Sequence, residues 1–406
     1  MNRRPVVVTG MGIISALGPD VSAFADGLRA GRCGISRLTL FDAGGSRSEL
    51  CGQAPEPELP ELVARGALPP HTSRPDRFGL RAALSAVADA RLGSRELLPA
   101  AVLFGIGTGG AAETEGYLRA LLSESDPALP QASQLVPHQP AAVTDLVARA
   151  LCAGGPRSTI MTACSSSAIA ISQALDLVAL GRVELALAGG TEGLCRLTCA
   201  GFSSLRATSP ELCRPFDIER KGLNLGEGAA VLVLESEEHA RRRGARIYAY
   251  LRGAGLSCDA HHMTAPHPEG AGALRAMRAA LRDAQLPPEA VGYINAHGTC
   301  TPHNDAAESA AVRALLGARA AQVPISSIKS MVGHTLGAAG AIEAVASVLA
   351  LLDESLPPTV HLQTPDPEFG LDFIRETARA ARVDVVMSAS FAFGGNNAVL
   401  VFSRAA

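Results

Sequence analysis

The chain has 406 residues, of which 47% are hydrophobic, so it can form two domains or one large duplicated domain with a substantial core. Its net charge of -3, its 4% aromatic content and its lack of Trp argue against nucleic-acid binding through overall positive charge or base stacking. The nine cysteines, an odd number at irregular spacing, argue against a disulfide framework and favour a reducing cytoplasm.

The chain begins with a short apolar run, Val6-Val-Val, that ends at Thr9 and Gly10. This run is too short for a signal peptide and predicts a first strand. Gly, Ser, Thr and charged residues interrupt the later apolar runs, so no segment is expected to approach the ~18 residues of a membrane span. We therefore expect a cytoplasmic protein.

Short apolar runs alternate with longer Ala-rich stretches, for example residues 101–105, 141–150 and 184–188. Such alternation is typical of α/β layering, with helices on each side of a sheet. Residues 229–234 are apolar throughout, which predicts a central strand buried on both faces. Pro and Gly cluster in residues 54–70 and 363–370, which we interpret as surface loops.

The run Gly105-Ile-Gly-Thr-Gly-Gly110 matches Gly-x-Gly-x-x-Gly. A single match of this kind is weak evidence for a dinucleotide site. We interpret it as a turn at the end of a strand.

Cys164, in Thr-Ala-Cys-Ser-Ser, joins an apolar run to a helix of small residues. Free amides and the dipole of a first helical turn stabilise a thiolate, which predicts a lowered pKa and a nucleophilic sulfur. The alternative is an inert buried thiol, since free cysteine often packs as a small hydrophobe. Cysteine-dependent catalysis needs partners that are close in space, and two distant His segments can supply them.

A second small-residue helix follows His334 in Ser-Met-Val-Gly-His, which indicates a faint internal duplication. Two such helices can approach closely, so we expect them to pack together and to bring Cys164 and His334 near each other. We divide the chain into residues 1–250, which carry the cysteine, and residues 251–406, which carry both histidines.

His297 lies in Asn-Ala-His-Gly-Thr-Cys-Thr, where a strand ends in a glycine-containing loop. Loops at strand ends are where α/β proteins place reactive groups, and the Thr299 and Thr301 hydroxyls can line a polar channel. A purely structural hydrogen-bonding role for this histidine is the alternative.

Lys329 and His334 are predicted to lie at the mouth of the second small-residue helix, where the dipole keeps the imidazole neutral. A neutral imidazole can donate a hydrogen bond to a developing oxyanion. Glu343 follows on the expected helix and can anchor this network, together with Asp305.

Phe393-Gly394-Gly395 lies near the end of the chain between two apolar runs. Adjacent glycines let backbone amides approach a ligand, which predicts an oxyanion hole. A tight hairpin turn between two strands explains the same pattern.

Together these segments resemble the elongating β-ketoacyl-acyl carrier protein synthases. Val7-Val-Thr-Gly-Met-Gly-Ile near the start, Arg214-Pro-Phe-Asp-Ile-Glu-Arg and Gly226-Glu-Gly extend the similarity over essentially the whole chain. The resemblance implies a thiolase-like fold, with two pseudo-symmetric α/β halves in a five-layered α-β-α-β-α arrangement, normally as a dimer. It also implies a condensing enzyme of fatty-acid or type II polyketide or polyene biosynthesis.

In such an enzyme, Cys164 would carry the acyl chain as a thioester, and His297 and His334 would stabilise the enolate formed when malonyl thioester loses carbon dioxide. The Cys164 and Phe393 amides would form the oxyanion hole, with Phe393 as the gate. Lys329 would support the histidines, while Thr299 and Thr301 would bind the pantetheine arm. Neither a cofactor nor a metal is expected.

An acidic acyl carrier protein would dock on local basic residues, for which Arg206, Arg74 and Arg77 are candidates. Three positions bear on substrate and gating. Ala392 replaces the usual Gly and Asn396 the usual Thr beside the gate, and Thr108 lies where fatty-acid enzymes place a bulkier residue against the acyl tail. A smaller, more polar Thr108 indicates an unusual acyl chain.

Other functions stay open at this level. The chain could be a ketosynthase subunit that needs a chain-length-factor partner in a heterodimer, or a homodimer, or a non-catalytic partner subunit. The retained Cys164 argues against the last. A cysteine hydrolase would leave Lys329 and one His unused, and a thiolase would need a second reactive cysteine.

Overall fold

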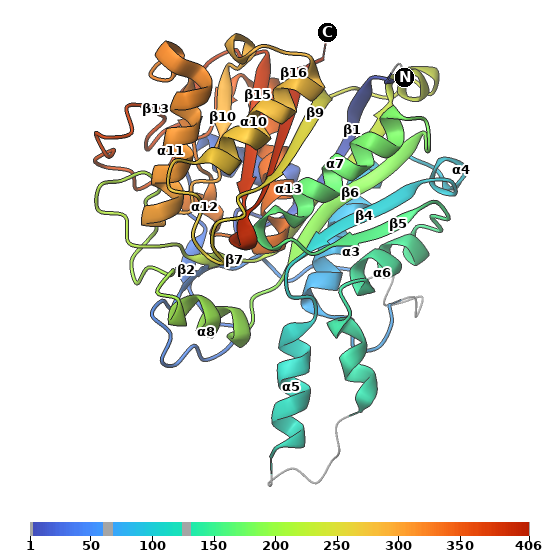
Figure 1. Ribbon diagram of the computed structural model, residues 1–406. Coiled ribbons are helices and arrows are strands. Elements are labelled where there is room, and N and C mark those ends of the chain that lie inside the picture. The colour runs from blue at the N-terminus through green and yellow to red at the C-terminus, as the bar shows by residue number, and fades with distance from the viewer. Residues whose placement is uncertain (1–2, 60–67, 124–130, 406) are drawn as a thin grey trace.

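A computed structural model describes residues 3–59, 68–123 and 131–405. Its centre is an 11-stranded sheet with the order β13-β11-β10-β15-β16-β9-β1-β8-β6-β4-β5 (Figure 1). These strands are β1 (Val6–Ile14), β4 (Ala101–Ile106), β5 (Arg157–Ile160), β6 (Leu185–Glu192), β8 (Gly228–Ser236), β9 (Ala249–Cys258), β10 (Tyr293–Asn295), β11 (Pro324–Ser326), β13 (Asp372–Phe373), β15 (Val385–Phe391) and β16 (Asn396–Arg404).

The strand order repeats within the chain. In the first half, β1 is followed across the sheet by β8, β6, β4 and β5, with two antiparallel pairings and then two parallel ones. In the second half, β9 is followed by β16, β15, β10 and β11 with the same succession of pairings. The two halves are therefore pseudo-symmetric, and the second set of strands starts at Ala249.

Helices cover both faces of each half in five layers. The helices α3 and α6 cover one side of the first half, α7 and α13 lie between the halves, and α10 and α11 cover the second half. The helices are α1 (Val21–Arg29), α3 (Arg74–Asp89), α4 (Ser94–Leu97), α5 (Ala111–Leu121), α6 (Ala142–Ala150), α7 (Ser166–Ala179), α8 (Arg196–Ser204), α9 (Glu237–Arg242), α10 (Ala271–Ala284), α11 (Pro302–Leu316), α12 (Lys329–Val332) and α13 (Ala339–Asp353).

The two small-residue helices α7 and α13 contact each other at the centre, as the duplication predicts. A Cβ added at Gly340 would lie 2.8 Å from both the backbone nitrogen and the Cβ of Ala168, so any side chain there would force the helices apart. Gly105 is as tightly placed, because its Cβ would come 2.1 Å from the Ser167 nitrogen. Small residues thus set the spacing of the layers.

The expectation that no segment resembles a membrane span is wrong for one stretch. Leu336–Asp353, which includes α13, has 18 residues and a mean hydropathy of 1.7. It is 89% buried inside the protein, so its apolar character belongs to a core helix that is covered on all sides.

Other sequence-based expectations concern strands and loops. The run Ala229–Leu234 is buried throughout within β8, as predicted for a central strand. The glycine-rich stretch after β4 is a turn that leads into α5, and residues 363–370 form a loop. Residues 60–67 of the other predicted loop lie outside the described residues.

Smaller elements complete the chain. Two small sheets consist of β2 (Ile35–Arg37), β3 (Leu50–Gly52) and β7 (Leu225–Gly226), and of β12 (Ser355–Leu356) and β14 (Arg379–Ala380). Short 3₁₀ turns are η1 (Ala132–His138), η2 (Ala163–Ser165), η3 (Pro288–Ala290), η4 (Gly317–Arg319), η5 (Leu336–Ala338) and η6 (Phe393–Gly395). Helix α5 and η1 project together from the body of the molecule (Figure 1).

Candidate active site

Cys164 lies in the short turn η2, between strand β5 and helix α7. The preceding residue, Ala163, has a φ of 53°, a left-handed conformation that non-glycine residues rarely adopt. Strain of this kind persists where the surrounding structure holds it and is common at functional sites. The turn leaves the Cys164 side chain 5% exposed, at the base of a cavity.

The protonation state of Cys164 differs from the sequence-based prediction. Burial raises the pKa of the thiol to about 12, although the Lys329 ammonium and the Phe393 backbone amide act in the opposite direction. The predicted lowering is wrong, because desolvation of a thiolate outweighs these favourable interactions.

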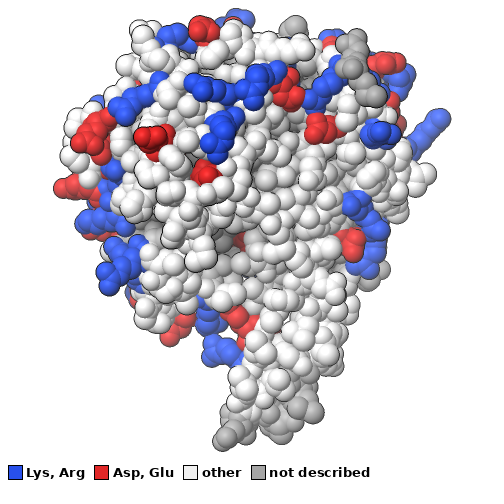
Figure 2. All heavy atoms as spheres, viewed as in Figure 1, with Lys and Arg blue, Asp and Glu red and all other residues white. Residues whose placement is uncertain are grey.

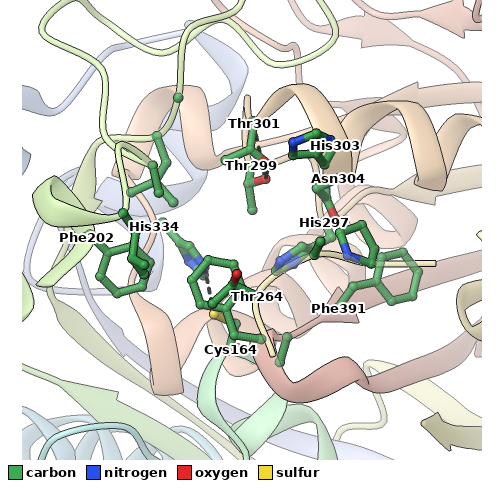
Figure 3. A pocket seen from close by; sticks show the side chains of 18 of the residues that line it. Cys164, Phe202, Thr264, His297, Thr299, Thr301, His303, Asn304, His334 and Phe391 are labelled. Carbon is green, nitrogen blue, oxygen red and sulfur yellow. Dashed lines mark hydrogen bonds between the residues drawn. The ribbon is translucent and has the colours of Figure 1, made fainter. Parts of the chain in front are cut away.

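His334 faces this sulfur. Its Nε2 lies 3.0 Å from the Cys164 Sγ, and its Nδ1 accepts a hydrogen bond of 3.3 Å from the Leu336 backbone amide (Figure 3). A ring nitrogen that accepts cannot carry the proton, so the neutral imidazole carries it on Nε2, toward Cys164. Burial and the Lys329 charge hold the pKa of His334 well below its usual value. The sequence analysis attributed a neutral His334 to the dipole of the following helix. Because α13 begins only at Ala339, burial and the Lys329 charge are the causes instead.

His297 lies just beyond the end of β10, and its ring stands edge-on to His334 with 5.4 Å between ring centroids. Its pKa is also held well below the usual value, by burial first, then by the Lys329 charge, and last by the nearby His334, since two adjacent imidazoles cannot easily both be protonated. The Lys329 Nζ lies 3.3 Å from the His297 Nδ1. Since an ammonium group can only donate, this contact places the imidazole proton on Nε2.

Lys329 is itself buried and forms an ion pair with Glu343 from α13. Burial raises the pKa of Glu343 to about 7, while Lys329 acts to lower it. Glu343 therefore contacts the network as predicted. It lies on α13, whereas Lys329 lies on α12 and His334 lies in the turn between these two helices.

The cavity above these groups has a volume of about 600 Å³. It is lined by Cys164, His297, His334, Thr299, Thr301, Phe393, Gly394 and Gly395, which were all expected at the site. The two threonine hydroxyls lie 2.8 Å apart on its wall (Figure 3). Four segments that are far apart in the sequence thus meet in one cavity.

Phe393 lies in the turn η6 between β15 and β16, so a hairpin turn is present, as the alternative interpretation predicted. Its backbone amide contacts the Cys164 thiol, and the oxyanion hole stays a prediction. Its ring stacks on Phe202 of α8, with 5.6 Å between centroids. The two unusual residues flank this turn, and the Ala392 amide donates to the Asn396 carbonyl at 3.0 Å.

Sequence reasoning missed two carboxylates that hold the site. Glu308 of α11 accepts hydrogen bonds from the His297 amide at 2.7 Å and from the Gly298 amide at 2.8 Å. Asp305, which was expected, accepts from the Phe216 and Cys300 amides. The only signal for Glu308 in the sequence was its place eleven residues after His297, on the following helix.

The second missed carboxylate is Glu192, which is fully buried at the end of β6. It accepts a hydrogen bond from the hydroxyl of Thr108 at 2.6 Å. Among the described residues, Thr108 is not one of those that line the cavity, so its expected contact with the acyl tail stays a prediction.

The three arginines expected to dock a carrier protein lie in different settings. Arg206 is exposed and lines the mouth of the cavity. The Arg74 side chain is 15% exposed and forms ion pairs with Glu227 and Glu56, and Arg77 also pairs with Glu56.

Within the described ranges, no group of three or more His, Cys, Asp or Glu side chains is arranged to hold a metal ion.

Comparison with known proteins assigns this geometry to a family. Residues 3–240 match the N-terminal domain of β-ketoacyl synthase and residues 248–363 match its C-terminal domain. The 3-oxoacyl-[acyl-carrier-protein] synthase 2 of Synechocystis is 40% identical over 100% of this chain and 99% of its own length.

Two solved structures have the same fold. The ishigamide ketosynthase/chain length factor has a TM-score of 0.94 at 37% identity, with 100% of both chains covered. A type II PKS acyl-carrier protein in complex with its ketosynthase bound to the hexaketide gives a TM-score of 0.91 at 32% identity, covering 99% of this chain and 100% of that one. The five-layered architecture is the thiolase-like fold, and the chain belongs to the β-ketoacyl synthase family.

Proposed function

We propose that the protein catalyses the decarboxylative condensation of malonyl-acyl carrier protein with an acyl chain held on Cys164. The observation that carries this proposal is the meeting of one thiol and two neutral imidazoles in a single cavity, with both imidazole protons on Nε2. A hydrolase would need only one such imidazole.

In the first half-reaction, the Cys164 sulfur attacks the carbonyl carbon of an acyl thioester, and the carrier thiol leaves with a proton. Negative charge then develops on the former carbonyl oxygen. The amides of Cys164 and Phe393 are the donors for that oxygen, as the contact between the Phe393 amide and the sulfur supports. Because burial raises the pKa of the thiol, we propose that the thiol proton is lost as the sulfur attacks the substrate.

In the second half-reaction, malonyl thioester loses carbon dioxide and its electron pair becomes an enolate. The Nε2–H groups of His297 and His334, two buried side chains, donate to the enolate oxygen. The carbanion attacks the Cys164 thioester, so that a carbon–carbon bond forms, the carbon–sulfur bond breaks and a β-ketoacyl product leaves on the carrier. The residues alone supply these roles, and we include neither metal nor redox cofactor.

The acyl carrier protein is the proposed partner. Thr299 and Thr301 are placed to bind the pantetheine arm, since both lie on the cavity wall. Three basic side chains, Arg47, Arg206 and Lys221, line the mouth of the cavity and are exposed. Lys221 is ion-paired with Glu211, so Arg47 and Arg206 are the main side chains that would give an acidic partner a local positive surface on a chain whose net charge is -3.

We include a second subunit in the proposal, either another copy or a chain length factor. Leu118, Leu121 and Leu122 on or beside α5 and Val136 on η1 are exposed, with values up to 80% at Leu122. The face shown in Figure 2 carries few charges where these elements project. Exposed apolar groups of this kind mark association surfaces. We place the assembly in the cytoplasm, as the nine free cysteines support.

The experiment incubates the purified chain with acyl- and malonyl-carrier proteins and follows products by intact mass. We expect a β-ketoacyl product two carbons longer than the acyl donor. Absence of product over a broad acyl panel, both for the chain alone and with candidate partner subunits, contradicts the proposal. Sedimentation of the same samples separates a homodimer from a heterodimer.

A further inference from the structure

Glu192 is a buried carboxylate that the proposed chemistry does not use. It lies at the end of β6, and its side chain is fully shielded from solvent. Its Oε1 accepts hydrogen bonds from the Thr108 amide at 3.0 Å and the Thr108 hydroxyl at 2.6 Å, and its Oε2 accepts from the Gly337 amide at 3.0 Å. All of these contacts are donors, which favour the ionised carboxylate, although burial raises the pKa of Glu192 above its ordinary value.

These contacts join the two halves of the molecule. Thr108 follows β4 in the first half, whereas Gly337 lies in η5 of the second half. The two turns are pressed together, because a Cβ on Gly337 would come 2.4 Å from the Gly107 nitrogen. Glu192 thus fixes η5 against the first half at a point where the backbones already touch.

The residue before Gly337 sets the protonation of His334. The Leu336 amide donates to the His334 Nδ1 at 3.3 Å, and Leu336 holds a left-handed φ of 44°. A leucine adopts this conformation only where its neighbours hold it. The bond from Glu192 to Gly337 is one residue away, so it holds the amide that keeps the imidazole proton on Nε2.

Glu192 also acts on the nucleophile through its charge. It is among the groups that raise the pKa of the Cys164 thiol, after the larger effect of burial. Loss of the carboxylate charge therefore makes the Cys164 thiolate easier to form. Loss of the hydrogen bond to the Gly337 amide frees the neighbouring Leu336 amide, so the His334 proton is no longer held on Nε2. A residue that served stability alone would not produce these two opposite effects.

We propose that Glu192 is a positioning residue that, through Gly337 and Leu336, holds the Nε2–H tautomer of His334 against Cys164. This inference rests on the proposed function, since it assigns His334 the role of donor to the enolate. Residues in such supporting shells typically change activity by about 10- to 100-fold when replaced.

The test replaces Glu192 with Gln, which keeps the shape but has one acceptor oxygen where the carboxylate has two. The Gln N–H₂ group then faces the backbone N–H of either Thr108 or Gly337, so one of these two backbone groups loses its acceptor. We expect kcat for malonyl decarboxylation to fall by about 10- to 100-fold with little change in KM. The rate of Cys164 alkylation by iodoacetamide, measured between about pH 6 and 10, should rise at every pH.

Glu235→Gln is the matched control. Glu235 is an equally buried carboxylate in the same sheet, but it pairs with Leu185 at the opposite end of β6. This variant should lose stability and leave both rates unchanged. Thr108→Val is a milder second variant, which removes one donor to Glu192 but keeps the carboxylate charge. It should lower the decarboxylation rate by a smaller factor and leave the alkylation rate largely unchanged.

Two results overturn the inference: wild-type rates in both Glu192→Gln and Thr108→Val, or alkylation that slows together with decarboxylation. Failure of the proposed function is a separate result. It is a wild-type chain that forms no β-ketoacyl product with any partner, and the alkylation comparison does not depend on that product.

Discussion

The reactive side chains are uncharged in the resting site because they are buried. Burial raises the pKa of Cys164 to about 12 and lowers the pKa values of His297 and His334. Each shift favours the neutral form, as desolvation requires. The site therefore holds donors for a negative charge that appears only during reaction, and this arrangement leads to two predictions for individual residues.

The first prediction concerns pH. Since both histidine pKa values lie well below 6.5, the rate of malonyl decarboxylation should stay level between about pH 6 and 8. Lys329→Met removes a positive charge that lowers both values, so the imidazoles become easier to protonate. In that variant the rate should decline as pH falls through this range. A wild-type inflection near pH 6.5, or identical profiles, would contradict the assignment.

The second prediction concerns stability. Burial raises the pKa of Glu308 to about 7 from an ordinary 4.5, so the folded state binds its proton more tightly than the unfolded chain. The resulting stabilisation is present at low pH and is lost as pH rises from about 4.5 to 7. Gln does not titrate. The destabilisation caused by Glu308→Gln should therefore be smaller at pH 8 than at pH 5, and denaturant unfolding at both pH values measures it.

At the scale of secondary structure, the site depends on how closely α7 and α13 approach. These helices place η2 with Cys164 next to the turn that carries His334. Their contact has no room for side chains at Gly340, where even a methyl group would meet Ala168 at 2.8 Å.

Gly340→Ala should therefore lower the free energy of unfolding by about 1–3 kcal/mol through overpacking. Gly116→Ala is the matched control, since Gly116 is also inside a helix but has open space around its Cα. That variant should raise stability by up to about 1 kcal/mol, because Ala is the better helix former. Equal effects in urea unfolding would show that the helix contact is not tight.

Local patterns were enough to predict the elements around the site. A small-residue helix after Cys164 and another after His334 indicated the central contact, and the loop after a strand indicated His297. The protonation of the site and its supporting carboxylates could not be predicted in this way, because they depend on which distant residues bury each group. The thiol pKa was predicted with the wrong sign, because the loss of water around Cys164 comes from residues far away in the sequence. Glu192 was missed because its partner Gly337 is 145 positions away.

At the scale of the whole molecule, an acidic chain presents a basic rim around its cavity. Arg47, Arg206 and Lys221 lie at the mouth that an acyl carrier would have to enter. Electrostatic complementarity of this kind changes the binding of the carrier protein more than the rate of the chemical step.

Arg206→Glu should raise KM for the malonyl carrier several-fold and leave kcat largely unchanged, with a smaller difference at high salt. Arg252→Glu carries the same charge change on an exposed arginine that does not line the cavity. A similar rise in KM for both variants would mean that the rim has no special role.

The central claim is that Cys164 carries the acyl chain while the two imidazoles act on malonyl thioester. Intact mass spectrometry of the chain after incubation with an acyl carrier, in the wild type and in Cys164→Ala, tests it most directly when carbon dioxide release from malonyl carrier is measured alongside. The account predicts an acyl adduct in the wild type only, with carbon dioxide release retained in the variant. An adduct that persists in Cys164→Ala, or a variant that keeps full condensation, would contradict it.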